Sequence, residues 1–419
     1  MAQLLLSDYT AALKEVVLPY IRDNFPKKTI LLDQLKRNAG VQVFNDEFIA
    51  PIYSSRHGGV ANLANDGNNV VSSGGRDTTR ATVGVEIVSA AFNISKLAID
   101  ASKSNTLAVE NALSAQTETL SKDFARHINR QFYNDGVGVV SKVRTTGGSV
   151  GTGTIAVEAI TASVDDARTL DWYGTINGDI SPTKYFAVDQ IIGVGTGAAA
   201  LGTITGVTGT SIVSGGPTAI VTAAEDAIYI LDGSGGGAGT SELLGIRAAL
   251  SSSTGTSTYA GLSRNQTGWT PSFGSASEAL TLSRMEDAYL SALEFSDTTD
   301  KFVILVNKTL YKKYGDILTS MRRTVNSADL LGGWKGLEFA AGGASVGVFL
   351  DYDVPDGECL FLNLDTWTLC QVSEVDWTGD ENSMLRLQNT IQFQAVMVWF
   401  VNALCLAPAA NAKQTRKTA

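Results

Sequence analysis

The residues that could carry chemistry in this chain are few and lie far apart. There are two histidines, His57 in a Gly-rich stretch and His127 in a segment with helical periodicity. Nucleophilic catalysis of the Ser-His-Asp kind needs a histidine held beside the nucleophile, and neither histidine has that setting in the sequence. We therefore expect His57 to serve a turn and His127 to lie on a helix face, and we predict no catalytic residue.

Three further motifs point weakly to ligands. Gly193–Ala198 has the glycine spacing of a dinucleotide fingerprint, but the residues after it are β-type rather than helical. Gly235–Ser241 lacks the lysine that a phosphate-binding loop needs. Asp351 and Asp353 hint at a calcium loop, yet Pro355 stands where the third ligand belongs. We predict no cofactor and no metal, so the chain is not expected to be an enzyme.

Charge and length narrow the class of protein. The 419 residues exceed the usual size of a single core, which predicts two or three lobes. The net charge is −10, whereas a protein that grips phosphates is normally basic. An acidic protein is repelled by nucleic acid phosphates rather than attracted to them, so this charge would suit the wall of a container better than a phosphate-binding surface.

Cysteine use and hydropathy indicate an intracellular chain without a membrane span. Cys359, Cys370 and Cys405 match no zinc spacing and are expected to be reduced thiols. No secretory signal is visible at the N-terminus. The longest apolar stretch, Ala395–Ala410, is interrupted by Asn402 and is shorter than the ~18 residues of a spanning helix, so we interpret it as a buried strand.

The first hundred residues predict an arm followed by an extended loop. Residues 1–56 form the N-terminal arm, with helices over Leu6–Phe25 and Ile30–Arg37. Residues 57–100 form an extended β-hairpin in which two stretches between 81 and 95 alternate with period two. A ribbon of this kind has little core of its own and needs a neighbouring surface. The expected intersubunit contacts are Val83, Val85, Ile87, Phe92 and Ile94. A strand pair at the edge of a sheet in the same chain is the equal alternative.

A long amphipathic helix is expected next, within the segment 101–139 and running from about Asn105 to Asn134. Its apolar side has spacings of four and seven, and its other side is charged, with Arg130 among the charged residues. The residues predicted to form the buried face are Val109, Leu113, Leu120, Phe124, Ile128 and Phe132. Such a helix is typical of a spine laid across a sheet.

The remaining segments predict a mixture of strands and helices. Short β-type runs separated by glycine turns, including Tyr185–Val188, indicate a small inserted β-barrel over 140–240. A loop-rich return follows over 241–300, with a helix at Ser277–Glu294. Residues 301–375 carry a buried strand at 302–306 and a helix from about Lys308 to Met321. A C-terminal strand and tail occupy 376–419. The class is α+β.

In this order of segments the chain resembles the major capsid protein of tailed double-stranded DNA bacteriophages, with the Hong Kong 97-like fold. The stretches that carry the resemblance are Leu13–Leu35, His57–Asp100, Asn105–Gly136, Val140–Asp232, Lys301–Met321, Leu350–Leu364 and Gln388–Pro408. In terms of that family they are the N-terminal arm, the extended loop, the spine helix, the inserted barrel, the strand and helix of the axial domain, an aspartate and Pro-x-Gly segment, and the terminal strand of the peripheral domain.

The resemblance implies a structural protein that assembles as hexamers and pentamers into an icosahedral shell around double-stranded DNA. Its expected partners are further copies of itself, a separate scaffolding protein, a portal protein and, in some cases, a decoration protein, with the DNA held by non-specific proximity. The expected location is the capsid of the virion, assembled in the host cytoplasm. Triangulation number, host, covalent cross-links, proteolytic processing and maturation movements are not determined by the sequence.

Three alternatives stay open. An encapsulin-like compartment has the same architecture and holds protein cargo. A tail or baseplate protein would suit the Gly-rich insert and would form rings or helical assemblies. An oxidoreductase built on Gly193–Ala198 is the enzymatic alternative.

Overall fold

The structure is a computed structural model that describes part of the chain. The described residues are 31, 35, 42–44, 46–53, 55, 57, 59–60, 62, 74–96, 106–136, 138–142, 154–156, 185–194, 200–207, 211–215, 227–231, 242–251, 258–266, 268–274, 276, 278–296, 301–320, 327–330, 334–341, 344–355, 357–378, 385–386, 391–415 and 417–418. The predicted arm helices fall almost wholly outside these ranges.

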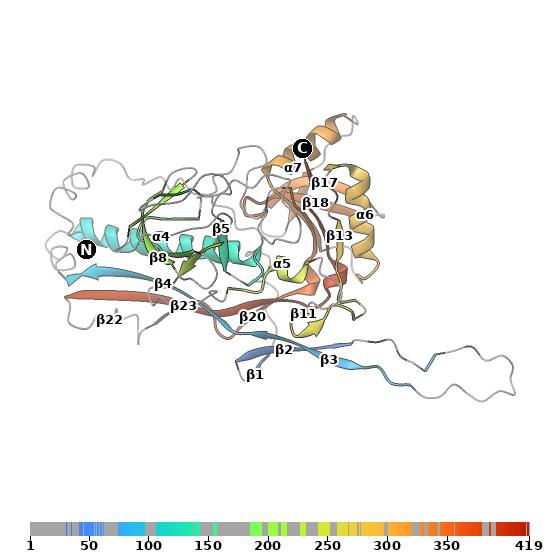
Figure 1. Ribbon diagram of the computed structural model, residues 1–419, viewed down its shortest axis with the longest axis horizontal. Coiled ribbons are helices and arrows are strands. Elements are labelled where there is room, and N and C mark those ends of the chain that lie inside the picture. The colour runs from blue at the N-terminus through green and yellow to red at the C-terminus, as the bar shows by residue number, and fades with distance from the viewer. Residues whose placement is uncertain are drawn as a thin grey trace.

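A long two-stranded ribbon forms the base of the molecule (Figure 1). Strand β4 (Glu86–Ser95) pairs antiparallel with β23 (Gln392–Cys405) over ten residues. The other edge of β23 pairs with β20 (Trp367–Gln371), β21 (Asp376–Thr378) and β22 (Leu385–Arg386). Val88 faces Trp399 across the ladder and both are buried, whereas the next residue, Ile87, is 65% exposed. The period-two alternation of β4 therefore buries one face of this peripheral sheet.

The spine helix lies along the buried face of the peripheral sheet. Helix α4 spans Thr106–Phe132, two residues shorter at its C-terminal end than predicted. Figure 1 shows it running beside β4 and β23. Phe124, Ile128 and Phe132 are buried in the same apolar core as Val88 and Trp399. The spacing of four residues between them places all three side chains on one side of the helix.

A second, smaller sheet extends from the base of the molecule. It consists of β1 (Gln42–Phe44), β2 (Glu47–Tyr53) and β3 (Thr78–Gly84) in that order, all antiparallel. Strand β3 ends at Gly84, and β4 begins two residues later with a different partner. A single extended segment therefore belongs to two sheets.

A seven-stranded mixed sheet with two helices on one face takes most of its strands from the segment predicted as the axial domain, and we call this unit the axial domain. Its order is β13 (Ser272–Gly274), β24 (Ala412–Gln414), β19 (Cys359–Asn363), β15 (Phe302–Val306), β18 (Ala344–Leu350), β17 (Trp334–Ala341) and β16 (Ser327–Leu330). Helices α6 (Leu282–Leu293) and α7 (Lys308–Ser320) share a core with alternate residues of β15, namely Phe302, Ile304 and Val306. The intervening Val303 and Leu305 face the main core, which explains why β15 is apolar throughout.

Residues 139–231 contribute a separate antiparallel sheet. Its six strands run in the order β5 (Val139–Lys142), β10 (Ala227–Leu231), β7 (Ile191–Val194), β8 (Ala200–Val207), β9 (Ser211–Gly215) and β6 (Thr154–Ala156). Val140, Ile192, Ile204 and Ile228 belong to its own apolar cluster. The run 185–188, predicted as a strand, is a turn instead, and the closure of this sheet into a barrel stays a prediction.

Further short elements lie in the segments predicted as the return, the axial domain and the C-terminal strand and tail. These are α5 (Ile246–Ala249), β11 (Thr258–Tyr259), β12 (Leu262–Ser263), β14 (Glu278–Ala279), η2 (Leu364–Thr366), η4 (Pro408–Ala410) and β25 (Lys417–Thr418). The predicted tail is not a loose end, because β24 is inserted between β13 and β19 and β25 pairs with β14. Two ion pairs hold it there, a buried one from Lys413 to Glu358 at 2.6 Å and one from the buried Lys417 to the partly exposed Glu278 at 2.9 Å.

Candidate functional site

The groups that could carry chemistry are held in inert settings in the part of the chain that the structure describes. Burial raises the pKa of the Cys370 and Cys405 thiols to about 12, which removes the thiolate that a nucleophile needs. His127 contacts Gln131 through its ring nitrogen at 2.8 Å. Within the described ranges no group of His, Cys, Asp or Glu could hold a metal ion.

The glycine motifs also lack the geometry of a nucleotide site where they can be seen. Gly193 and Val194 lie inside strand β7, and the next described element is strand β8 rather than a helix. A dinucleotide phosphate would therefore have no helix N-terminus to bind. The segment 235–241 lies outside the described residues. Among the helices that are described, none is both long and apolar enough to cross a membrane.

The β2–β3 hairpin is the feature that extends farthest from the rest of the molecule (Figure 1). Near its root, Phe48, Ala50, Ala81 and Val83 are buried in the main core. Toward its tip, Tyr53 is 61% and Val60 is 83% exposed. The hairpin therefore has a packed root and an outer part with apolar side chains in solvent.

Polar contacts hold the exposed strands of the hairpin in a fixed arrangement. The Arg76 guanidinium lies 3.9 Å from the centre of the Tyr53 ring, a cation–π geometry. The Arg76 Nε donates to the Ser55 carbonyl at 3.3 Å, and the Asp77 amide donates to the Ser55 hydroxyl at 3.0 Å. The two strands thus stay paired after they leave the body.

The root of the hairpin is tied to the body by Asn402. Its Nδ2 donates to the Gly84 carbonyl at 2.8 Å, and its Oδ1 accepts from the Leu244 amide at 2.8 Å. The Thr82 amide donates to the Ala260 carbonyl at 2.9 Å. One buried side chain of β23 therefore links the point where β3 becomes β4 to the segment that precedes α5.

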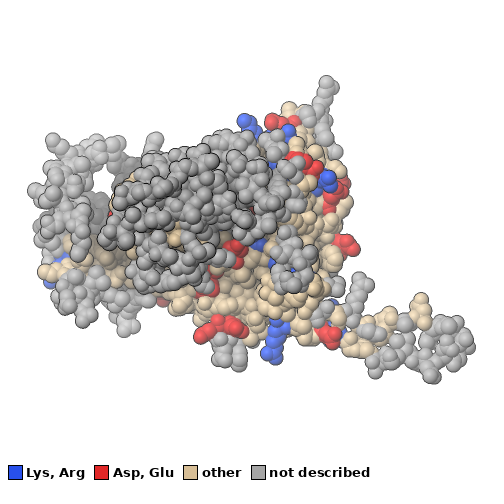
Figure 2. Space-filling model, in the orientation of Figure 1, with Lys and Arg blue, Asp and Glu red and all other residues tan. Residues whose placement is uncertain are grey.

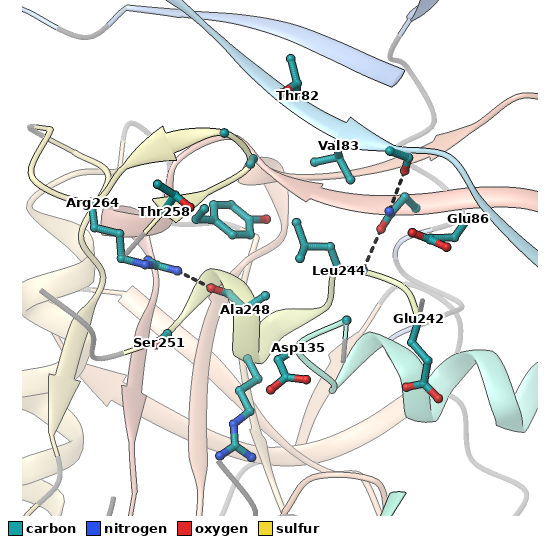
Figure 3. A pocket seen from close by; sticks show the side chains of 17 residues that line it. Thr82, Val83, Glu86, Asp135, Glu242, Leu244, Ala248, Ser251, Thr258 and Arg264 are labelled. Carbon is teal, nitrogen blue, oxygen red and sulfur yellow. Dashed lines mark hydrogen bonds between the residues drawn. The ribbon is translucent and has the colours of Figure 1, made fainter. Parts of the chain in front are cut away.

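A cavity of about 550 Å³ lies beneath this root. Figure 3 shows Thr82 and Val83 of β3 on one side of it and Leu244 and Glu242 on the other. Its wall also contains Arg264, which donates to the Ala249 carbonyl at 2.9 Å. Asn402, Glu242 and Arg264 of the wall bond to other groups of the protein itself. We therefore interpret the cavity as the space of a joint rather than as a ligand site.

The turn that supports β3 is conformationally unusual. Ala260 and Gly261, which connect β11 to β12, both have positive φ, at 49° and 76°. These values fit a two-residue type I′ hairpin turn, in which glycine is favoured. A Cβ at Gly261 would also meet the Thr82 hydroxyl oxygen at 2.9 Å. The turn can therefore approach β3 closely only because position 261 has no side chain.

The C-terminal end of α4 is a second joint, with buried polar groups on the side that the sequence predicts to face solvent. The Arg130 guanidinium forms an ion pair with Glu242, and the Asn134 amide donates to the same carboxylate. Arg130 is thus wrongly predicted to lie on the exposed charged side. The segment 242–245 covers this part of the helix, and a Cβ at Gly245 would lie 2.3 Å from the Phe132 carbonyl oxygen.

The same helix end also meets the axial domain and the inserted sheet. The Tyr133 hydroxyl donates to Asp351 at 2.8 Å, and the Asn129 amide donates to Asp353 at 2.6 Å. The Tyr185 hydroxyl, from the turn before β7, donates to the other oxygen of Asp353. The pair of aspartates that hinted at calcium therefore connects three parts of the fold.

The residues predicted for the buried face of the spine helix have three outcomes. Phe124, Ile128 and Phe132 are buried, with exposures of 6%, 1% and 0%. Leu120 is half-buried. Val109 and Leu113 lie within α4, but their side chains are outside what the structure describes.

The residues predicted for intersubunit contact are not brought together on one free ribbon. Val83 is buried in the core of its own chain, and Val85 packs against that core. Phe92 and Ile94 are half-buried on β4, where Phe92 meets the Trp377 ring edge-on at 6.2 Å. Only Ile87 is largely exposed. Residues 86–95 therefore form a strand in a sheet of the same chain, as the alternative interpretation predicts. The projecting hairpin is formed by β2 and β3.

Sequence reasoning missed Asn402 and Glu242 as joint residues. Asn402 had a visible signal, because one amide interrupts an otherwise apolar stretch from Ala395 to Ala410. A buried amide in such a strand must find hydrogen-bond partners. Glu242 lies beside a Gly-rich segment, and no local pattern relates it to Arg130.

Comparisons with solved structures place the fold. No protein-family model and no curated protein matches the sequence. A chain of the cyanophage A-1(L) capsid asymmetric unit is similar, with a TM-score of 0.57, 14% identity and 96% of each chain covered. The capsid of the native GTA particle has a TM-score of 0.46, 11% identity and 96% of each chain covered. The SrpI encapsulin from Synechococcus elongatus PCC 7942 has 0.46, with 8% identity and coverage of 97% of this chain and 95% of that one.

TM-scores of 0.46 are too low to assign a fold, whereas the score of 0.57 for the cyanophage capsid chain indicates a shared fold. It extends over nearly the whole chain, so the α+β fold of a phage capsid subunit, predicted from the order of segments, is confirmed.

Proposed function

We propose that this chain is the major capsid protein of a tailed double-stranded DNA bacteriophage, with a structural and not an enzymatic role. Copies of it assemble as hexamers and pentamers into an icosahedral shell. The observation that supports this best is the β2–β3 hairpin, whose outer part leaves the body with Tyr53 and Val60 in solvent. A paired ribbon of this kind gains stability when a neighbouring copy covers it.

The contact we propose is between the outer hairpin of one subunit and the spine helix of the next. The exposed side of α4 near its middle is polar and charged, with Glu118, Lys122 and Asp123 exposed. Arg76 and Asp77 near the base of the hairpin tip can pair with such a surface. Each contact is weak, and closure of the shell makes many of them effectively intramolecular.

The remaining partners belong to the same proposal. A separate scaffolding protein, a portal protein and a decoration protein would bind the shell, which forms in the host cytoplasm and becomes part of the virion. The DNA lies inside by proximity, in keeping with a net charge of −10.

The test is a variant that lacks only the outer hairpin. Tyr53 is paired with Thr78, so residues 54–77 can be replaced by Asn-Gly, which closes a two-residue turn between them. Because Phe48, Ala50, Ala81 and Val83 are kept, we expect a soluble, folded subunit that forms no shells in electron microscopy. Normal shells from this variant would refute the role of the hairpin.

The contents and shape of the unmodified particles separate the alternatives. Closed shells that contain DNA support the capsid, and shells that contain a protein cargo indicate an encapsulin-like compartment. Rings or tubes without closure indicate a tail or baseplate protein. Calorimetric binding of a nicotinamide dinucleotide would support the oxidoreductase.

A further inference from the structure

The two helices of the axial domain have outward faces of opposite charge. The outward face of α6 carries Glu286, Asp287 and Glu294, with the exposed apolar side chains of Leu290 and Phe295 between and beside them. The outward face of α7 begins with Lys308 and Lys312, which are exposed, and Lys313 is beside them, with Asp316 one turn farther on. We name these the acidic face of α6 and the basic face of α7. Figure 2 shows both acidic and basic side chains on the part of the molecule that α6 and α7 form.

At the ends of α6 and α7, the charged side chains have the sign that the helix dipole disfavours. A helix is stabilised by acidic residues in its first turn and basic residues in its last turn. In α6 the first turn has no acidic residue and the last turn no basic one, and Glu294 follows directly at the C-terminal cap. In α7 the first turn has no acidic residue and starts at Lys308. The opposite charge at Glu294 and at Lys308 would suit the two helix dipoles better, so helix stability does not explain these two residues.

The placement strengthens the field that each helix presents to a partner. The C-terminal end of α6 carries the negative end of its dipole, and Glu294 adds to it. The N-terminal end of α7 carries the positive end, and Lys308 and Lys312 add to that. Inward residues of both helices, such as Met285 and Leu310, are buried in one core, so the two outward faces are held rigidly on the same domain.

We propose that the acidic face of α6 of one copy docks on the basic face of α7 of a second copy, and that Leu290 and Phe295 become buried in this contact. The inference rests on the proposed function, because it specifies how the subunits of one ring meet. The two surfaces differ, so the contact is head-to-tail and repeats by rotation into a closed ring. Complementary charge sets which faces meet, and apolar burial adds affinity.

The experiment reverses one face at a time. The first variant is Glu286→Lys with Asp287→Lys, and the second is Lys308→Glu with Lys312→Glu. Like charges would then oppose each other across the contact, so we expect each variant to need a concentration about tenfold higher or more for assembly at low salt. Both variants should unfold at the same temperature as the unmodified chain or higher, since all four changed side chains are exposed and the second reversal suits its helix dipole. Static light scattering and thermal unfolding monitored by circular dichroism measure the two quantities.

Two mixing experiments make the test specific. A chain that carries all four substitutions keeps the net charge of the original and restores opposite charges at the contact, so it should assemble again. In the first variant both faces are basic, and in the second both are acidic, so each variant attracts only the other. A mixture of the two should therefore give rings with an even number of subunits, and no five-membered rings, in native mass spectrometry.

The outcomes distinguish this contact from the broader proposal. The docking of α6 on α7 is refuted if either two-substitution variant assembles like the unmodified chain. It is also refuted if the four-substitution chain is folded but does not assemble. Neither result refutes the proposal that the chain forms a shell. A loss of assembly only in the second variant, with less co-purified DNA, would show that α7 faces nucleic acid and also refutes it. If the unmodified chain forms no closed shell, the proposed function itself fails.

Discussion

Arg130 and Glu242 form an ion pair in the interior of the protein, with 1% and 6% of their side chains exposed. They are 112 residues apart in the sequence and join the end of the spine helix to the segment that returns from the inserted sheet. The pair fixes where these two parts of the chain meet.

Removal of one member of this pair should be strongly destabilising. In Arg130→Met the Glu242 carboxylate stays buried without its guanidinium partner, and we expect a loss of about 3–5 kcal/mol in the free energy of unfolding. Lys122→Met is the matched control, because Lys122 pairs with Glu118 at the surface of the same helix and should cost about 1 kcal/mol or less. Chemical denaturation measures both, and equal losses would show that the buried pair has no special role.

Asn402→Ala should loosen the root of the hairpin. The Gly84 carbonyl and the Leu244 amide each lose a partner, and an unsatisfied buried group costs about 1–3 kcal/mol. Hydrogen exchange should show lower protection at Thr82 and Val85 than in the unmodified chain. Gln392→Ala, an exposed polar position at the other end of β23, is the control and should leave both amides unchanged.

Phe124→Asp should abolish soluble expression. Phe124 is 6% exposed and lies between α4 and the peripheral sheet, where a carboxylate would have no solvent. Thr119→Asp, on the exposed side of the same helix, should express normally. A folded Phe124→Asp protein with the circular dichroism spectrum of the original would mean that the buried side of the helix is wrongly assigned.

Acid should weaken the fold partly through His127. Burial, together with the positive charge of Arg130, lowers the pKa of this histidine to about 3, against about 6.5 in an unfolded chain. Between these values the unfolded chain binds the proton and the folded chain does not. The stability that depends on neutral His127 is therefore complete above about pH 6.5 and is lost as the pH falls toward 3.

The histidine variant isolates this contribution from that of the carboxylates. His127→Gln has no such group, so its free energy of unfolding should fall less between pH 6.5 and pH 4 than that of the original chain. Denaturation curves at several pH values measure the difference. Identical pH dependence in the two proteins would exclude His127 as a contributor.

Several elements could be predicted because their cause is local. The spacing of Phe124, Ile128 and Phe132 defines one side of α4 whatever packs against it. Strand β15 is apolar at every position, which is typical of a strand covered on both faces, and its bounds were predicted correctly. Helix α7 was likewise predicted to within one residue at its end.

Other features depended on contacts between distant segments. The alternation in 86–95 shows that one face is buried, yet it does not say whether the cover belongs to the same chain. In the structure β4 pairs along its edge with β23, some 300 positions later, and helix α4 of the same chain lies on its buried face. Among the described strands, β2 and β3 form the hairpin that projects. The polar groups at the end of α4 follow the same rule, because a charged side chain such as Arg130 is as compatible with a surface as with a buried partner.

By itself, the sequence determined the kinds of most of the described elements and their order, since these follow from periodicity and residue type within short windows. The tertiary structure decided which strands pair, that residues 412–414 are inserted into the axial sheet while 417–418 pair with β14, and that Asn402 holds the hairpin root. Pairing between segments hundreds of residues apart is set by the packing of the whole chain, and no local pattern encodes it.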